Sequence, residues 1–134
     1  MRNKLTILAI LSFFTVACSS IKEAQNMVEI DVAFEWSAAD RCSVKSPAFT
    51  ISNVPAETKS LAFRMTDLNV LSYSHGGGTV PYTGSGLIPA GAFSYKGPCP
   101  PAGAHDYEFT VTAVNAAGDT VVARGKAVRS FPPK

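Results

Sequence analysis

The sequence lacks several features that would assign it to common functional classes. No segment shows the apolar period and terminal capping residues of a helix, and no internal repeat or low-complexity tract is present. Charged residues make up only 16% of the 134 residues, and lysine and arginine form no cluster, which argues against nucleic-acid binding. There is no Cys-x-x-Cys pair of the kind that holds zinc. These absences leave a chain rich in alternating β patterns and without a catalytic motif.

The N-terminal stretch has the layout of an export signal. Arg2 and Lys4 give a positive start, residues 5–16 form an apolar run, and Ala17 supplies a small residue at a cleavage point. The run is too short to cross a bilayer as a helix. We therefore expect residues 1–17 to be a signal peptide that is absent from the mature protein.

The junction that follows predicts lipidation. Thr15-Val16-Ala17-Cys18 resembles a bacterial lipobox, which implies that Cys18 carries acyl chains and becomes the mature N-terminus. Ser19 in the next position implies sorting to the outer membrane, with the protein facing the periplasm. The alternative is an ordinary cleaved signal with Cys18 as a bystander. We expect residues 18–26 to be a lipidated tether and residues 27–134 to be one domain, formally neutral because Arg2 and Lys4 are removed.

The two remaining cysteines are expected to form a disulfide. Once Cys18 is assigned to the lipid, Cys42 and Cys99 are left as a pair in a chain sent to an oxidising compartment. Two free buried thiols are the alternative.

The rest of the chain predicts β-strands joined by turns. Alternating apolar and polar residues predict strands at 28–37, 49–52, 60–66, 107–114 and 120–128, the last a weak edge strand because of Gly125. Residues 97–101 contain three prolines and predict a stiff segment that pairs with no strand. Together these patterns predict an all-β, antiparallel β-sandwich.

Four polar side chains are expected to meet at one end of the sandwich. Asp67 has the same parity as the inward residues of its strand, and a buried carboxylate needs compensating partners. His105 and Tyr107 take the equivalent inward position on another strand. His75 lies between these two strands in the sequence, in a predicted glycine-rich loop. Each also has a simpler interpretation. Asp67 could cap a turn, His75 could be a solvated loop residue, and His105 and Tyr107 could be strand residues whose polar tips reach water.

These residues carry a resemblance to a known family. The block Gly97-Pro98-Cys99-Pro100-Pro101-x-Gly-x-His105-x-Tyr107-x-Phe109, preceded by Asp67 and His75, resembles the phosphatidylethanolamine-binding protein family, in particular its bacterial Raf kinase inhibitor-like branch. The resemblance implies an antiparallel Greek-key β-sandwich with a small anion pocket at one end. It implies that Asp67, His75, His105 and Tyr107 form the pocket and that Gly97 and Pro98 form its rim. The family's prolines after Asp67 and its tryptophan after His75 are absent here, which implies a looser wall.

The function expected from this resemblance is non-enzymatic binding of phosphate-like groups or phospholipid head groups, by a protein attached to the membrane through its lipid. No metal, cofactor or nucleic acid is expected. A second hypothesis is a protein-interaction or inhibitor module whose pocket is vestigial. Two histidines and a carboxylate also match an iron or zinc site. His75-Gly76-Gly77-Gly78 is similar to an esterase oxyanion loop, but no Gly-x-Ser-x-Gly nucleophile motif accompanies it.

Overall fold

The computed structural model describes residues 20–134, so the predicted signal peptide and Cys18 lie outside the described residues. Its regular secondary structure consists of β-strands, apart from one short 3₁₀ helix, η1 (Ala38–Asp40). The strands are β1 (Lys22–Glu29), β2 (Asp31–Phe34), β3 (Phe49–Ser52), β4 (Thr58–Asp67), β5 (Ser74–Pro81), β6 (Leu87–Ile88), β7 (His105–Asn115) and β8 (Thr120–Phe131).

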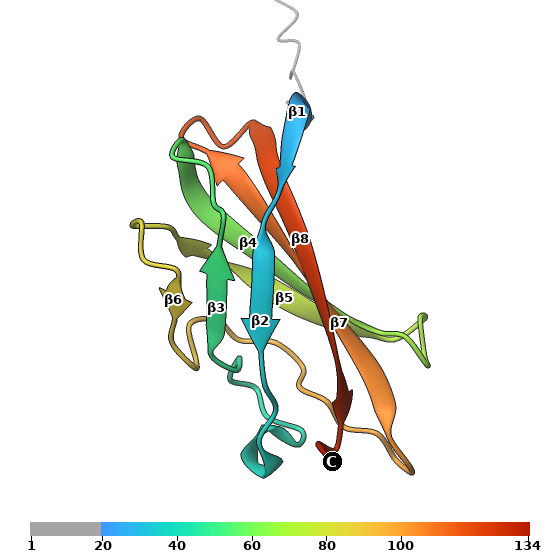
Figure 1. The fold of residues 1–134 in the computed structure, drawn as a ribbon. Helices are drawn as coiled ribbons and strands as arrows, with labels where there is room; N and C mark the ends of the chain where they lie inside the picture. The colour runs from blue at the N-terminus through green and yellow to red at the C-terminus, as the bar shows by residue number, and fades with distance from the viewer. Residues whose placement is uncertain (1–19) are drawn as a thin grey trace, which may run out of the picture.

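The strands form two sheets whose apolar faces share one core (Figure 1). One sheet has the order β1-β8-β7-β4-β5 and the other the order β2-β3-β6. Aromatic rings pack between the sheets: the centroid of the Phe49 ring lies 4.8 Å from that of Phe63 and 4.9 Å from that of Phe109. The mostly-β prediction is confirmed, while its Greek-key connectivity stays a prediction.

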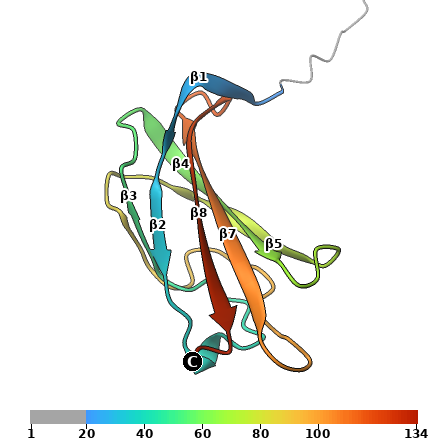
Figure 2. The same cartoon turned by 45° about the vertical axis from the view of Figure 1, so that its right-hand side comes forward.

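The pairing of the strands departs from the antiparallel prediction at one edge. β1 pairs with β8 in parallel, with Lys22 opposite Thr120, so β8 lies inside the large sheet and the prediction of an edge strand was wrong. The same pairing places residues 22–26, which we expected to belong to the tether, in a strand of the sheet. Figure 2 shows β1 at the end of the molecule opposite the C-terminus.

The strand predicted at 28–37 divides between the two sheets. Val28 is exposed in β1, whereas the side chains from Ile30 to Trp36 follow the predicted alternation and bury Ile30, Phe34 and Trp36. The backbone N–H of Ile30 donates to the oxygen of Arg124 over 3.1 Å. Gly125 lies beside this point, where a Cβ atom would overlap the backbone oxygen of Ile30. The glycine is therefore required by the crossing of the chain from one sheet to the other, and it does not mark a weak edge.

His75 and its three glycines also lie in a strand, where the sequence predicted a loop. β5 pairs with β4, with Phe63 opposite Gly78 and Arg64 opposite Gly77. A Cβ at Gly77 would overlap the backbone oxygen of Phe63, and one at Gly78 would overlap the Phe93 ring. These glycines serve close packing of backbone and core, which fixes His75 on the sheet.

Gly125→Ala is expected to destabilise the domain by about 2 kcal/mol, because the added methyl group collides with backbone rather than with a flexible side chain. Gly103→Ala is the matched control: its φ of 67° makes the substitution cost about 1 kcal/mol, but its Cβ meets no atom within 4 Å. Urea unfolding of the two variants measures the difference. Equal losses in both variants would contradict the assigned role of Gly125.

Candidate functional site

A cavity of about 350 Å³ lies at the end of the large sheet, where β4 ends, β5 begins and β7 begins. Its lining consists of Asp67, Val70, Tyr73, His75, Cys99, Pro100, Pro101, His105 and Tyr107. A larger depression of about 410 Å³ lies over β2, β3 and β6, but only one charged residue, Glu35, and no histidine line it. Both histidines of the chain and the buried carboxylate of Asp67 line the smaller cavity, which we call the end pocket.

Asp67 closes β4 as a buried carboxylate. The inward residues Leu61, Phe63 and Met65 are buried as parity predicted, and Asp67 is only 4% exposed. Its Oδ1 accepts hydrogen bonds from the backbone N–H groups of Asn69 and Val70, at 2.8 and 3.1 Å. The predicted turn cap and the predicted pocket residue are thus the same side chain in two roles.

His105 supplies the third hydrogen bond to this carboxylate. It is the first residue of β7, and its Nδ1 lies 2.8 Å from Oδ2 of Asp67. Burial opposes ionisation of Asp67, but the bonds from His105, Asn69 and Val70 outweigh it and hold the pKa of Asp67 below its ordinary value of 3.8. The Asp67 carboxylate is therefore charged at neutral pH.

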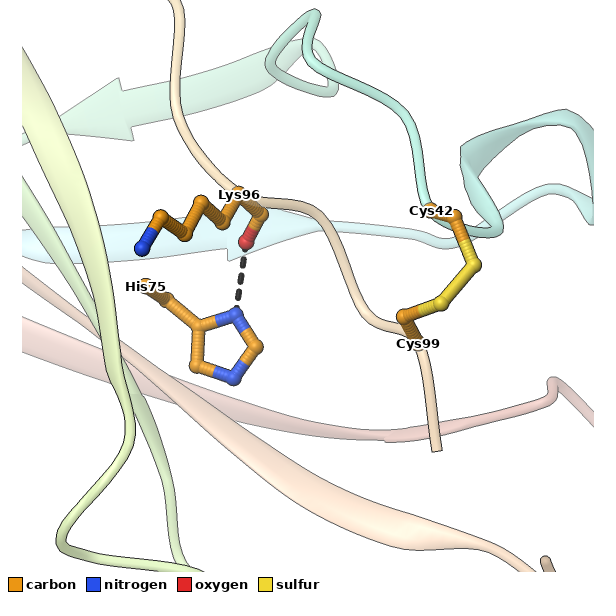
Figure 3. Close-up of a disulfide and its surroundings, with 4 residues drawn as sticks. All are labelled: Cys42, His75, Lys96 and Cys99. Atoms are coloured by element: carbon orange, nitrogen blue, oxygen red, sulfur yellow. Dashed lines mark hydrogen bonds between the residues drawn. A yellow bond between two sulfur atoms is a disulfide. The ribbon is translucent and has the colours of Figure 1, made fainter. Parts of the chain in front are cut away.

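His75 is buried rather than solvated. It is 3% exposed, and its Nδ1 lies 2.6 Å from the backbone oxygen of Lys96, as Figure 3 shows. Since a carbonyl oxygen only accepts, Nδ1 carries a proton. Its Nε2 lies 4.0 Å from Oδ2 of Asp67 and has no hydrogen-bond partner among the described residues. The interpretation of His75 as a solvated loop residue is wrong.

Tyr107 forms the wall between the two imidazoles. Its ring centroid is 5.4 Å from that of His75 and 6.2 Å from that of His105. Burial, together with the charge of Asp67, raises the pKa of Tyr107 to about 12. The phenol therefore stays protonated at neutral pH and keeps its O–H for donation.

The proline-rich segment lines the pocket with residues 99–101, where residues 97 and 98 were expected. Gly97 and Pro98, predicted as the rim, are buried behind it, and the rim is made by Cys99, Pro100 and Pro101. As predicted, the segment pairs with no strand, but it is hydrogen-bonded to a neighbouring loop: the N–H of Gly97 donates to the oxygen of Ser43, and the oxygen of Pro98 accepts from the N–H of Cys42. Both glycine and proline thus hold the rim in place from behind.

The predicted disulfide is present between Cys42 and Cys99. Their Cα atoms are 4.7 Å apart, and the bond joins the rim to the segment after η1 (Figure 3). Because Cys99 also lines the end pocket, the disulfide fixes part of the pocket wall.

Sequence reasoning missed the apolar side of the pocket. Val70 and Tyr73 line it, and they belong to a turn whose Leu68, Val70, Leu71 and Tyr73 are 40–74% exposed. Tyr73 has the same parity as His75, and its ring centroid lies 4.7 Å from that of His75. The strand parity used for Asp67 could have found Tyr73 if β5 had been recognised as a strand.

Two further searches cover the described residues only. Between residues 20 and 134, no three His, Cys, Asp or Glu side chains are arranged to hold a metal ion. No helix in that range is long and apolar enough to cross a membrane.

Comparison with known proteins identifies the fold. No family model matches the sequence, and no curated protein matches it significantly. Among solved structures, Escherichia coli YbcL, described as a new member of the mammalian phosphatidylethanolamine-binding protein (PEBP) family, aligns with a TM-score of 0.60 and 18% identity over 80% of this chain and 100% of that chain. The PEBP homolog CT736 from Chlamydia trachomatis aligns with a TM-score of 0.58 and 17% identity over 87% of this chain and 100% of that chain. The chain therefore has the fold of PEBP proteins, as its motif block implied.

Asp67→Asn is expected to remove a stabilising effect that depends on pH. Because the folded-state pKa is lowered, the ionised carboxylate stabilises the fold fully above pH 3.8, and this contribution is lost as the pH falls through the folded-state value. At pH 7 the free energy of unfolding of the variant should be lower by about 2 kcal/mol, which is the contribution of a hydrogen bond to a charged group.

Thermal unfolding between pH 7 and pH 2.5 measures this effect. The gap between wild type and Asp67→Asn should narrow below about pH 4, whereas the exposed Asp31→Asn control should show a small gap throughout. A gap that stays constant down to pH 2.5 would show that the charge of Asp67 is not what stabilises the fold.

Proposed function

We propose that this protein is a non-enzymatic binding protein of the PEBP type that holds phosphate-bearing head groups in the end pocket. The observation that carries the proposal is the convergence of Asp67, His75, His105 and Tyr107 on one cavity in a PEBP fold. YbcL and CT736 are named as PEBP-family proteins, and a small polar pocket at the end of a sheet suits a head group. No nucleophile or metal is assigned to the pocket, so the proposed activity is binding alone.

Two side chains that line the pocket can donate to a phosphate. Tyr107 keeps its hydroxyl proton, and His105 has one ring nitrogen, Nε2, that is not used by Asp67. When the ring is protonated, this nitrogen becomes a charge-assisted donor, a stronger kind than a neutral one. Lys96 contacts one of the lining residues, with its Nζ 5.4 Å from the centroid of the Tyr73 ring. Since no arginine or lysine lines the pocket itself, the affinity for phosphate should be modest.

A second function is favoured by a different observation. The exposed Leu68, Val70, Leu71 and Tyr73 form an apolar edge beside the pocket, and such an edge suits contact with a protein. In this case the pocket would be vestigial, and the protein would be an interaction or inhibitor module.

The proposal includes a lipid anchor at Cys18 and a place in the cell envelope, with the protein facing the periplasm. Only three residues lie between Cys18 and Lys22, so the four Cα–Cα steps of this linker span at most about 14 Å. Lys22 pairs with Thr120 at one end of β8, and His105 pairs with Phe131 at the other end, roughly 35 Å away. The end pocket thus opens at the end of the domain far from the anchor, where it is accessible to head groups in the periplasm.

Binding of phosphoethanolamine is expected with a dissociation constant on the order of 1 mM, or about −4 kcal/mol. An NMR titration of the mature protein should move the signals of His105 and Tyr107, and His105→Ala should abolish binding.

The alternative function has its own signature in the same titration. If His105 and Tyr107 do not respond, the head-group proposal fails. The apolar edge at 68–73 would then be the surface to examine for a protein partner.

Anchoring is tested separately with Cys18→Ala. This variant should move from the membrane fraction to the soluble fraction or fail to mature, because acyl chains contribute about 0.8 kcal/mol for each buried CH₂. Unchanged membrane partition and unchanged mass would rule out lipidation, without bearing on the pocket.

A further inference from the structure

Strand β5 is an open edge of the large sheet. It is the last strand in the order β1-β8-β7-β4-β5, and it pairs with β4 on one side. Within the described chain, the backbone of residues 76–81 forms hydrogen bonds to no backbone other than that of β4. The N–H of Lys96, which donates to the oxygen of His75, bonds just before this stretch. Such an edge presents free N–H and C=O groups to any strand that lies beside it.

The register of β5 against β4 shows which of its backbone groups point outward. The N–H of Tyr82 donates to the oxygen of Lys59, and hydrogen-bonded positions alternate along an antiparallel pair of strands. It follows that Gly77 and Thr79 turn both their N–H and their C=O groups away from β4. Pro81 has the same orientation but has no N–H to donate.

The other sheet edges of the described chain are protected from pairing with another chain. β1 carries charged side chains and has an irregular register between Glu23 and Val28. Hydrogen bonds from Ile30 and Trp36, on either side of β2, join that strand to β8, and β6 is only two residues long. Charge, irregularity and short length are the usual protections of a sheet edge. Residues 76–80 of β5 have no charged side chain and regular pairing with β4, so this edge lacks them.

A second copy of the chain fits this edge in one antiparallel register. When Gly78 of each copy lies at the twofold axis, Gly77 of one copy lies opposite Thr79 of the other. Each such pair exchanges both of its N–H···O bonds, and the twofold axis repeats the pair. Moving the axis to Gly77 would place Thr79 opposite His75, whose oxygen is already bonded. Moving it to Thr79 would place Gly77 opposite Pro81, which has no N–H.

The side chains on the outer face of the sheet suit the same register. Gly77 lies opposite Arg64 within the chain, and both line a depression of about 360 Å³ together with Thr79. Arg64 is exposed and forms no ion pair with another described residue. In the symmetric pair, Thr79 of one copy lies beside Gly77 of the other. Because Gly77 has no side chain, the guanidinium of Arg64 can reach over it and donate to the Thr79 hydroxyl of the second copy.

We propose that the edge of β5 from Gly77 to Thr79 is a self-association site, at which a second copy of this chain adds its own β5 in antiparallel orientation and joins the two large sheets into one. The inference does not rest on the end pocket or on the proposed function. The paired stretch is short, because Pro81 limits it at one end and the bonded oxygen of His75 limits it at the other. The association should therefore be weak, with a dissociation constant on the order of 0.1 mM.

Sedimentation velocity and amide hydrogen exchange of the mature protein test the proposal. Over an about hundredfold range of concentration around this dissociation constant, the sedimenting mass should rise from that of a monomer to that of a dimer. Exchange of the amide protons of Gly77 and Thr79 should slow as the concentration rises, since the second copy accepts hydrogen bonds from them. The amide of Val80 is bonded to β4 in the monomer, so its exchange should change less.

Two variants and a control locate the contact. Thr79→Lys places an ammonium group beside Arg64 of the second copy and should weaken the association about tenfold or more. Arg64→Ala, at an exposed residue, should weaken it about threefold and keeps the test valid if Thr79→Lys does not fold. Thr50→Lys makes the same substitution at an exposed strand residue of the other sheet and should leave the association at its wild-type strength.

Three outcomes would overturn the proposal. One is a wild type that stays monomeric at every concentration. Another is a dimer that Thr79→Lys weakens no more than Thr50→Lys does. The third is slowed exchange at Gly77 and Thr79 in a periplasmic extract while the pure protein stays monomeric, which would show that the edge takes a strand of another protein. Titration of the end pocket is unaffected by any of these results.

Discussion

The carboxylate of Asp67 is the contact on which the end pocket depends. Through Oδ1 it closes the turn that follows β4, and through Oδ2 it holds the first side chain of β7. The turn is also hydrogen-bonded to β7: the N–H of Leu68 donates to the oxygen of Asp106, and the side chain of Asn69 accepts from the N–H of Asp106. A charge buried to this degree is costly without partners, and these same partners define the shape of the site. The structural role of Asp67 is therefore tied to the shape of the pocket.

The second constraint is the fixation of the pocket rim from outside the pocket. Three prolines stiffen the segment, while its hydrogen bonds go to Cys42 and Ser43, and the disulfide adds a covalent link to the same neighbour. Lys96 lies just before the rim. Its carbonyl oxygen accepts a hydrogen bond from the imidazole Nδ1–H of His75, and its backbone N–H donates to the backbone oxygen of His75. The rim is thus bonded on one side to the segment after η1 and on the other side to β5. The positions of these three parts of the pocket therefore depend on one another.

The sequence predicted the parts of this arrangement that depend on strand period. Inward parity placed Asp67 and Tyr107 correctly because alternation holds along a strand whose neighbours bury one face. Parity could not show that the chain changes sheets at Ile30, since a buried residue fits the alternation in either sheet. It also failed at β5, where three consecutive glycines look like a loop, although two of them, Gly77 and Gly78, are required by close contacts with Phe63 and Phe93. Those contacts come from distant segments and leave no local pattern.

The charges of the pocket residues restrict its possible ligands more than its shape does. The motif block implied an anion site, and shape alone would accept a phosphate. The hydrogen bonds give the pocket a charged carboxylate, that of Asp67, and a buried ring nitrogen, Nε2 of His75, that has no partner among the described residues. The protonated phenol of Tyr107 and the half-buried imidazole of His105 line the same pocket. Because no lysine or arginine lines the pocket, a bound anion would depend on these two side chains for its hydrogen bonds, and the charge of Asp67 would oppose it.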